Sequence, residues 1–93
     1  MNKKIIILLK QKSWKIDNNN KKAFKVYTFH TFKNAFSWMT EVSFEAEKIN
    51  HHPEWKNVYN KVEVTLTTHD TDELSSKDLN LASFMDSEFE KYK

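Results

Sequence analysis

The chain has 93 residues, enough for one small domain, and its 39% hydrophobic content with seven Phe, three Trp and three Tyr can supply a packed core. It contains no cysteine, which excludes disulfides and thiolate metal sites and fits a reducing cytoplasm, and no glycine, which excludes the glycine-dependent dinucleotide and phosphate loops. All fifteen basic residues are Lys, so the paired donors with which Arg reads guanine or phosphate are missing, and we predict no nucleic-acid partner.

The first half of the chain predicts a short helix, a hairpin and a long helix. Residues 2–12 carry a weak helical pattern, although their apolar run IIILL is too short for a membrane span or a signal-peptide core, so we expect no membrane partner. The segment WKIDNNNKKAFKVYTFH indicates two strands around a turn at residues 18–20, because Asn favours turns and tolerates positive φ.

The long helix is predicted to begin after Thr31, which suits an N-cap, and to run to about Asn50. Its predicted buried stripe follows helical spacing and consists of Phe32, Ala35, Phe36, Met39, Val42, Ala46 and Ile49. Trp38 and Phe44 fall off this stripe, which leaves two interpretations: partly exposed aromatic residues, or cover for a subunit contact.

The second half predicts another hairpin, with Asn60 and Lys61 at its turn, and a final helix over residues 76–92. The strand after the turn alternates, with Val62, Val64 and Leu66 on one face. The inward residues of the last helix are predicted to be Leu79, Ala82, Met85 and Phe89. The order β-β-α-β-β-α, with a short N-terminal helix, predicts an α+β two-layer sandwich in one domain, residues 1–93, with helices on one face of a four-stranded antiparallel sheet.

Two adjacent histidines stand in the segment EAEKINHHPEW, just before the only proline. Pro53 biases His52 towards extended backbone, so the long helix should end close to His51. Glu47 lies four residues before His51, one helical turn away, where a carboxylate can orient the imidazole. With His69 from the end of a strand, three groups of ordinary pKa near ~6.5 would make an acid–base set at neutral pH.

Other interpretations of these residues are open. Histidine near a helix end is often only a favourable cation, and three histidines could bind zinc, although adjacent histidines cannot easily aim both rings at one ion. His30 is expected to be a surface residue. Asp78 completes the capping-box pattern with Ser75, and Trp55 is either core or a flat surface for a flat heterocycle.

The spacing of these residues resembles the signature of the pterin-4a-carbinolamine dehydratase family. Three residues separate Glu47 from the His-His-Pro triplet, five separate that from Tyr59, nine separate Tyr59 from His69, and eight separate His69 from Asp78. The segments AFSWMTEVSFEAEKINHHPEWKNVYNKVEVTLTTH and LSSKDLNLASFM are similar to the family pattern almost throughout. The resemblance covers about residues 23–86.

This resemblance implies a 4a-hydroxytetrahydrobiopterin dehydratase, a hydro-lyase that eliminates water to give quinonoid dihydropterin in tetrahydrobiopterin recycling, with no metal or redox cofactor. By likeness, His51 and His69 would transfer protons, His52 would bind and assist, and Glu47 would orient His51. The pterin would contact those three histidines together with Pro53, Thr68, Asp70 and Thr71. Trp55 is a further candidate contact, and Asp78 is expected to support the site mainly as a helix cap.

The family also implies partners and an alternative role. We expect a homodimer or homotetramer in the cytoplasm, with an aromatic amino acid hydroxylase as a possible supplier of substrate. The alternative function is that of a non-catalytic dimerisation cofactor of a protein partner, as animal members of the family serve a homeodomain transcription factor. Glu73 stands where the family commonly has glycine, so the loop after His69 is predicted to follow a different path.

Overall fold

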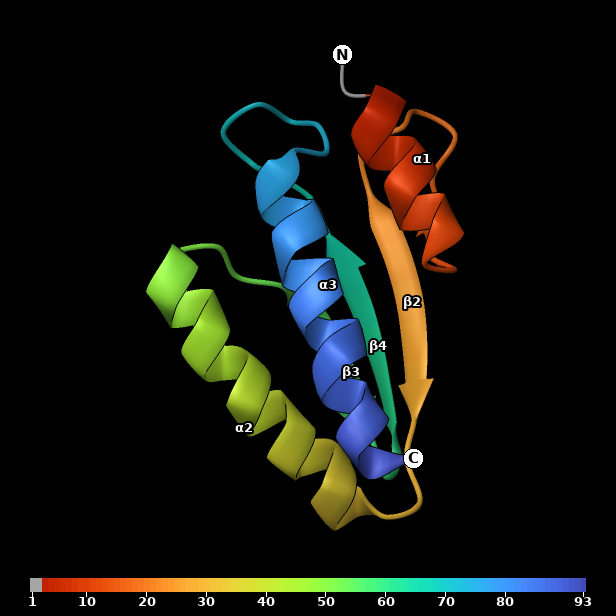
Figure 1. Ribbon diagram of the computed structural model, residues 1–93, viewed down its shortest axis with the longest axis vertical. Helices are drawn as coiled ribbons and strands as arrows, with labels where there is room; N and C mark the ends of the chain where they lie inside the picture. Colours follow the sequence, from red (N-terminus) through yellow and green to blue (C-terminus); the bar gives the residue numbers. More distant parts are fainter. Residues whose placement is uncertain (1–2) are drawn as a thin grey trace.

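The computed structural model describes residues 3–93 as helices packed on one antiparallel sheet (Figure 1). In chain order the elements are α1 Lys3–Gln11, β1 Lys15–Ile16, β2 Ala23–Thr28, α2 Phe32–Ile49, β3 Glu54–Val58, β4 Lys61–Leu66, α3 Ser76–Phe89 and the 3₁₀ turn η1 Glu90–Tyr92. The predicted α+β class and the order of its elements are confirmed, including the short N-terminal helix. Among residues 3–93, no helix is long and apolar enough to cross a membrane.

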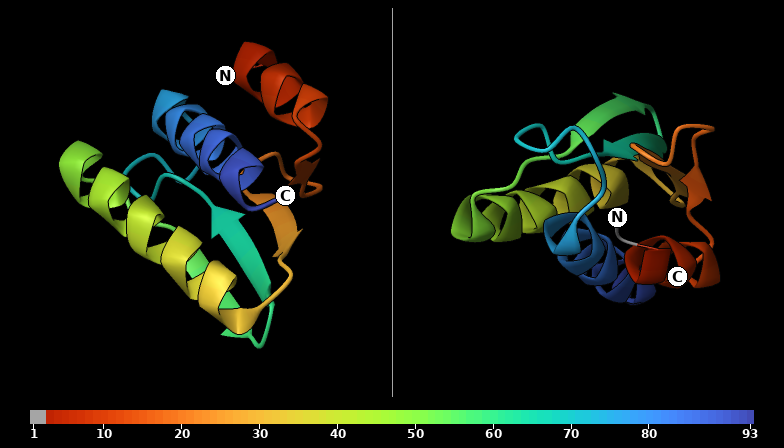
Figure 2. Two further views of the ribbon diagram at one scale, coloured as in Figure 1. Left: turned by 60° about the horizontal axis from the view of Figure 1, so that its bottom comes forward. Right: turned by 90° about the horizontal axis from the view of Figure 1, so that it is seen from above.

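The sheet has the strand order β1-β2-β4-β3 and every neighbouring pair is antiparallel. All three helices lie on one side of it, as the view along the molecule shows (Figure 2). Strand β4 buries Val62, Val64 and Leu66 under the helices and turns Glu63 away from them, as its alternating pattern predicted. The core therefore lies between one face of the sheet and the helices.

The two hairpin turns use Asn and an exposed Tyr to reverse the chain. In the turn between β1 and β2, Asn20 has φ 59°, and Asp17 Oδ1 accepts hydrogen bonds from the Lys21 and Lys22 amides at 2.7 and 2.9 Å. The second turn was predicted at Asn60 and Lys61, which is wrong by one residue. It consists of Tyr59 and Asn60, because Tyr59 takes the left-handed φ of 52° and Lys61 already begins β4.

Helix α2 begins as predicted, with the Thr31 side chain accepting a hydrogen bond from the Asn34 amide at 3.0 Å. Its buried stripe was predicted partly wrongly. Phe32 and Phe36 are about half exposed, whereas Trp38 is fully buried and donates its indole N–H to the Met85 carbonyl at 3.1 Å. The stripe is rotated towards Trp38 because α2 packs against α3 as well as against the sheet.

Helix α3 begins with the predicted capping box, in which Ser75 and Asp78 exchange hydrogen bonds with each other's backbone. Leu81, Ala82 and Met85 are fully buried, and the predicted inward residues Leu79 and Phe89 are partly buried against the same core. The α-helix ends at Phe89, and the chain continues to Tyr92 as a 3₁₀ turn. The fold thus places the start of α3 beside the end of α2, where the candidate site lies.

Candidate active site

A cleft of about 400 Å³ opens where three segments of the chain meet: the end of α2 with the start of β3, the loop after β4, and the first turn of α3. In Figure 1 the green end of α2 is the end of that helix nearer the cyan loop. The residues that line the cleft are Asn50, His51, His52, Pro53, Glu54, Thr68, His69, Asp70 and Lys77. The cleft therefore brings together the adjacent residues His51 and His52 and the distant residue His69.

The backbone at the end of α2 sends the two adjacent histidines in different directions. Asn50 has a left-handed conformation (φ 52°), and the amides of Asn50 and His51 return to the last helical carbonyls, with His51 N–H bonded to the Ala46 carbonyl at 3.0 Å. The helix therefore ends at Ile49, one residue before the left-handed turn. His51 then enters the protein, and its side chain is only 9% exposed, whereas that of His52 is 54% exposed.

His51 is held by a buried carboxylate from α3. Its Nε2 lies 2.6 Å from Oδ1 of Asp78, whose side chain is fully buried. The other oxygen, Oδ2, accepts hydrogen bonds from the Thr68 hydroxyl at 2.7 Å and from the Ser75 amide at 2.9 Å. Because a carboxylate only accepts, Nε2 of His51 carries the proton, and Nδ1 is the nitrogen that can gain or lose one.

The predicted pairing of Glu47 with His51 is wrong. Glu47 Oε2 lies 2.6 Å from Nε2 of His52 instead, and both side chains are largely exposed. The prediction assumed that His51 continues the helix, but the left-handed residue Asn50 removes His51 from the helical register. Asp78 takes the place that Glu47 was expected to fill, in addition to its predicted capping role.

His69 stands on the loop after β4 and faces a carboxylate that sequence reasoning missed. Its Nε2 lies 3.3 Å from Oε2 of Glu54, and its side chain is 74% exposed. Glu54 begins β3, opposite Thr65 near the end of β4, so the hairpin register brings it towards the segment that leads to His69. A register argument on the predicted hairpin could have indicated this neighbour.

Some predicted residues lie outside the cleft. Trp55 packs on Trp38, with ring centroids 6.2 Å apart, so it is a partly buried core residue, one of the two interpretations left open. Thr71 does not line the cleft, and its hydroxyl donates to the Glu73 carbonyl at 3.5 Å. Tyr59, part of the spacing pattern, lies at the turn of the hairpin, at the opposite end of β3 from Glu54. His30 is exposed, as expected.

The cleft also contains two residues that the sequence did not single out, Asn50 and Lys77. Each histidine of the cleft has one carboxylate beside it: Asp78 for His51, Glu47 for His52 and Glu54 for His69. Within residues 3–93, no group of three His, Asp or Glu side chains is arranged to hold a metal ion. The arrangement can move protons to and from a molecule bound between the histidines.

Comparison with known proteins shows to which family the chain belongs. The sequence model of the family described as pterin 4 alpha carbinolamine dehydratase matches residues 2–88. The chain belongs to this family. A Rhizobium meliloti relative, provisionally named a pterin-4-alpha-carbinolamine dehydratase, is 51% identical over 79 residues, which cover 85% of this chain and 76% of the relative. A relative from Sinorhizobium medicae with the same name is 47% identical over 79 residues, 85% of this chain and 75% of its own.

Two solved structures share the fold of this chain. A transcriptional coactivator/pterin dehydratase from Brucella melitensis superposes with a TM-score of 0.87 at 30% identity over 95% of each chain. A pterin dehydratase-like protein, described as a RuBisCO assembly factor of the alpha-carboxysome, superposes with a TM-score of 0.70 at 16% identity, over 82% of this chain and 88% of its own. The second likeness concerns the fold alone.

In the loop after His69, this member of the pterin dehydratase family has Glu73 where glycine was expected. Glu73 adopts extended pairing with Thr68, with amide-to-carbonyl distances of 3.2 and 3.4 Å in the two directions. The left-handed conformation falls on the preceding residue, Asp72, with φ 52°. The non-glycine residue Asp72 therefore makes the tight reversal, and its amide bonds the His69 carbonyl at 3.3 Å.

Proposed function

We propose that this protein is a 4a-hydroxytetrahydrobiopterin dehydratase that works by histidine acid–base catalysis. The observation that carries the proposal is the meeting of His51, His52 and His69 at one cleft, each beside a carboxylate. Membership in the pterin carbinolamine dehydratase family, and the name carried by relatives up to 51% identical, support the choice of substrate. The proposed physiological role is tetrahydrobiopterin recycling.

The reaction is an elimination of water without a net change of oxidation state. The bond from carbon 4a to its hydroxyl oxygen breaks as an acid protonates that oxygen, and a base removes the proton of the adjacent ring nitrogen. The electron pair released from the N–H bond forms the carbon–nitrogen double bond of quinonoid dihydropterin, and water leaves. Because the atoms and electrons balance, the proposed step calls on no metal or redox cofactor, only on positioned proton donors and acceptors.

Within this proposal the histidines have different tasks. His51, held through Nε2 by buried Asp78, presents a fixed imidazole for one proton transfer, and His69 serves the other from the loop after β4. Exposed His52, held by Glu47, binds the pterin and assists. Further pterin contacts are proposed for Pro53, Thr68 and Asp70, which line the cleft.

The test is a direct assay on freshly generated 4a-hydroxytetrahydropterin, with and without a chelator. We expect His69→Ala and His51→Gln to lower the rate by roughly 10²–10⁴-fold, the usual contribution of a positioned acid or base. Gln at position 51 keeps a donor for Asp78, and His69 is exposed, so both variants should fold. His30→Ala is the matched control, because it removes an exposed histidine outside the cleft and should leave the rate unchanged.

Two results would contradict the proposal: a wild-type protein no faster than buffer, or full activity in both histidine variants. Loss of activity on chelation would favour a metal mechanism instead. Circular dichroism of each variant separates loss of chemistry from loss of fold.

A second candidate function is a non-catalytic role as a binding cofactor of a protein partner. Its support is that the Brucella melitensis relative is described as a transcriptional coactivator as well as a pterin dehydratase. This role would not need the three histidines, so it predicts that partner binding survives the His51 and His69 substitutions. We further propose a homodimer or homotetramer located in the cytoplasm, with an aromatic amino acid hydroxylase as the source of substrate.

A further inference from the structure

The loop that carries His69 is exposed and needs support from outside itself. Thr68 and Leu74, at its two ends, are buried, but the four residues from His69 to Asp72 are exposed. Inside the loop, the Asp72 amide bonds the His69 carbonyl, and Thr68 pairs with Glu73. The 3.3 Å contact of His69 with Glu54 links the first exposed residue of the loop to β3. None of these contacts attaches Asp72, at the other end of the exposed stretch, to the body of the protein.

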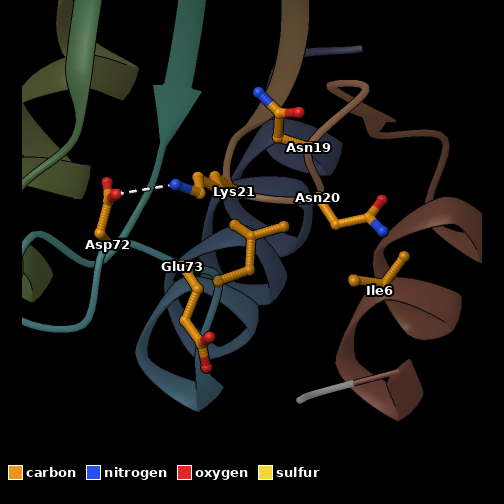
Figure 3. A pocket seen from close by; sticks show the side chains of 7 residues that line it. Ile6, Asn19, Asn20, Lys21, Asp72 and Glu73 are labelled. Atoms are coloured by element: carbon orange, nitrogen blue, oxygen red, sulfur yellow. Dashed lines mark hydrogen bonds and ion pairs between the residues drawn. The ribbon is translucent and has the colours of Figure 1, made fainter.

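The turn between β1 and β2 supplies such an attachment. Lys21 Nζ lies 2.9 Å from Oδ2 of Asp72, a contact marked by the dashed line in Figure 3. The Lys21 carbonyl accepts a hydrogen bond from the Thr67 hydroxyl at 2.7 Å. The turn itself is fixed by Asp17, whose Oδ1 accepts the amides of Lys21 and Lys22. Hydrogen bonds thus fix the backbone of Lys21, while its side chain contacts the loop.

The space beneath this ion pair is hollow. A cavity of about 120 Å³ lies between Ile6 of α1, the turn residues Asn19 to Lys21, and Asp72 to Leu74 of the loop (Figure 3). The Lys21–Asp72 pair spans this opening between the turn and the loop. The hydrogen bond and charge of Asp72 raise the pKa of Lys21, while Lys21 lowers the pKa of Asp72, so both groups are charged around neutral pH.

We propose that Lys21 and Asp72 are positioning residues for His69, forming a brace that keeps its loop in the conformation that binds pterin. The inference rests on the proposed function of His69, although neither Lys21 nor Asp72 lines the cleft. Without the brace the loop occupies other conformations, and the apparent affinity falls in proportion to the competent fraction. Bound pterin restores the order of the loop, so KM should change more than kcat.

The first experiment measures both constants in Lys21→Met, Asp72→Asn and the double variant. Exposed ion pairs contribute little, so we expect KM to rise by about two- to five-fold and kcat to change by less than about two-fold. The double variant should be no worse than either single one, because both remove the same contact. Exchanging the charges, Lys21→Asp with Asp72→Lys, should recover part of the loss.

The matched control is Lys22→Met, which removes the same charge from the same turn but leaves the Lys21–Asp72 pair intact; its KM should stay at the wild-type value. Salt provides an independent comparison, because at 1 M the screening length falls to about 3 Å. At high salt the wild-type KM should rise towards that of Lys21→Met, whereas the KM of Lys21→Met should change less with salt.

The second experiment does not depend on enzyme activity. It measures the order of the loop by NMR, from the hydrogen-exchange rates of the Asp72 and Glu73 amides. Lys21→Met should accelerate exchange at both amides by about two- to five-fold relative to Lys22→Met. Equal KM and equal exchange in the two lysine variants would overturn the brace. If the wild type showed no dehydratase activity, the proposed function would fail, and the exchange data would still decide whether Lys21 holds the loop.

Discussion

Asp78 takes part in two hydrogen-bond systems with one side chain. Oδ2 completes the capping box of α3 through the Ser75 amide and also accepts from the Thr68 hydroxyl, while Oδ1 holds His51. A carboxylate that is fully buried needs such donors, and the N-terminal end of a helix adds favourable partial charge. The start of α3, the loop after β4 and the end of α2 are therefore joined at one residue.

Replacing Asp78 by Asn tests this junction. The amide keeps the size of the carboxylate but cannot accept through both of its polar atoms, so at least one donor, His51, Thr68 or Ser75, loses its partner. We expect unfolding to require about 1–3 kcal/mol less free energy. We expect kcat to fall on the order of 10²-fold, the lower end of what a positioned acid or base contributes, because His51 is no longer oriented. Urea denaturation and the dehydration assay measure the two effects.

Glu47→Gln is the comparison for that experiment. Glu47 pairs with the exposed His52, so the substitution should leave the urea midpoint unchanged and reduce kcat/KM by only about two- to five-fold. If Glu47→Gln proved the more damaging of the two variants, the assignment of Asp78 as the partner that orients His51 would be wrong.

At the scale of single residues, the carboxylate partner of His51 could not be predicted from the sequence. The helical spacing of Glu47 and His51 is real in the chain, but Asn50 ends the helix between them. Asp78 is 27 residues from His51, and only the packing of α3 beside the end of α2 brings them together. The histidines themselves could be predicted because the family pattern fixes their positions, whereas Lys77 has no such local signal.

At the scale of the elements, a second polar cluster joins α3 to β2 and to the segment after α1. Asp86 accepts the Tyr27 hydroxyl, the Lys25 ammonium at 2.8 Å and the Trp14 indole N–H at 3.3 Å. The Lys25 ammonium also donates to the Lys12 carbonyl at 2.7 Å. Burial, reinforced by the bond to Asp86, raises the pKa of Tyr27 well above its ordinary value.

Tyr27→Phe should therefore have an effect that depends on pH. The folded state holds the Tyr27 proton more tightly than the unfolded chain, where tyrosine ionises near pH ~10. Its contribution is complete below that pH and is lost as the pH rises above it. We expect the variant to be about 1.5–3 kcal/mol less stable at pH 8 and the difference to shrink towards pH 11. Urea titrations at several pH values measure it.

Trp14→Phe is the control for the pH dependence, since it removes another donor to Asp86 without removing a group that titrates near pH 10. Its destabilisation should stay constant over the same range. A Tyr27→Phe difference that also stayed constant would mean that Tyr27 ionises equally in the folded and unfolded states.

The burial of α2 was harder to predict than its limits. Its cap at Thr31 and its end near Asn50 follow from local chemistry, and both are confirmed. Which face is buried depends on two neighbours at once, because α2 contacts α3 and the sheet. The helical spacing of apolar residues predicted that Phe32 and Phe36 are buried. In the structure these two side chains are about half exposed, and Trp38 is buried instead. Hydrophobicity alone cannot distinguish a core residue from one that covers another surface.

At the scale of the whole molecule, α2 carries exposed aromatic side chains that do not contribute to the core of the single chain. Phe32, Phe36 and Phe44 are 49%, 56% and 69% exposed, on a helix whose opposite side is fully buried. Phe32 and Phe36 contact each other, with ring centroids 5.9 Å apart. Such clustering on the surface of a small domain is typical of a subunit contact, and burial there would enlarge a modest core.

We therefore expect self-association through α2, and Phe36→Lys should weaken it. A lysine in a helix–helix contact places an unpaired charge among apolar side chains, which shifts the equilibrium towards monomer by at least about ten-fold in dissociation constant. Sedimentation velocity across a range of concentrations measures the shift. Val58→Lys on the open face of the sheet is the control, since Val58 is 59% exposed and lies away from α2. If Phe36→Lys and wild type sedimented identically while Val58→Lys dissociated, the contact would lie on the sheet and not on the helix.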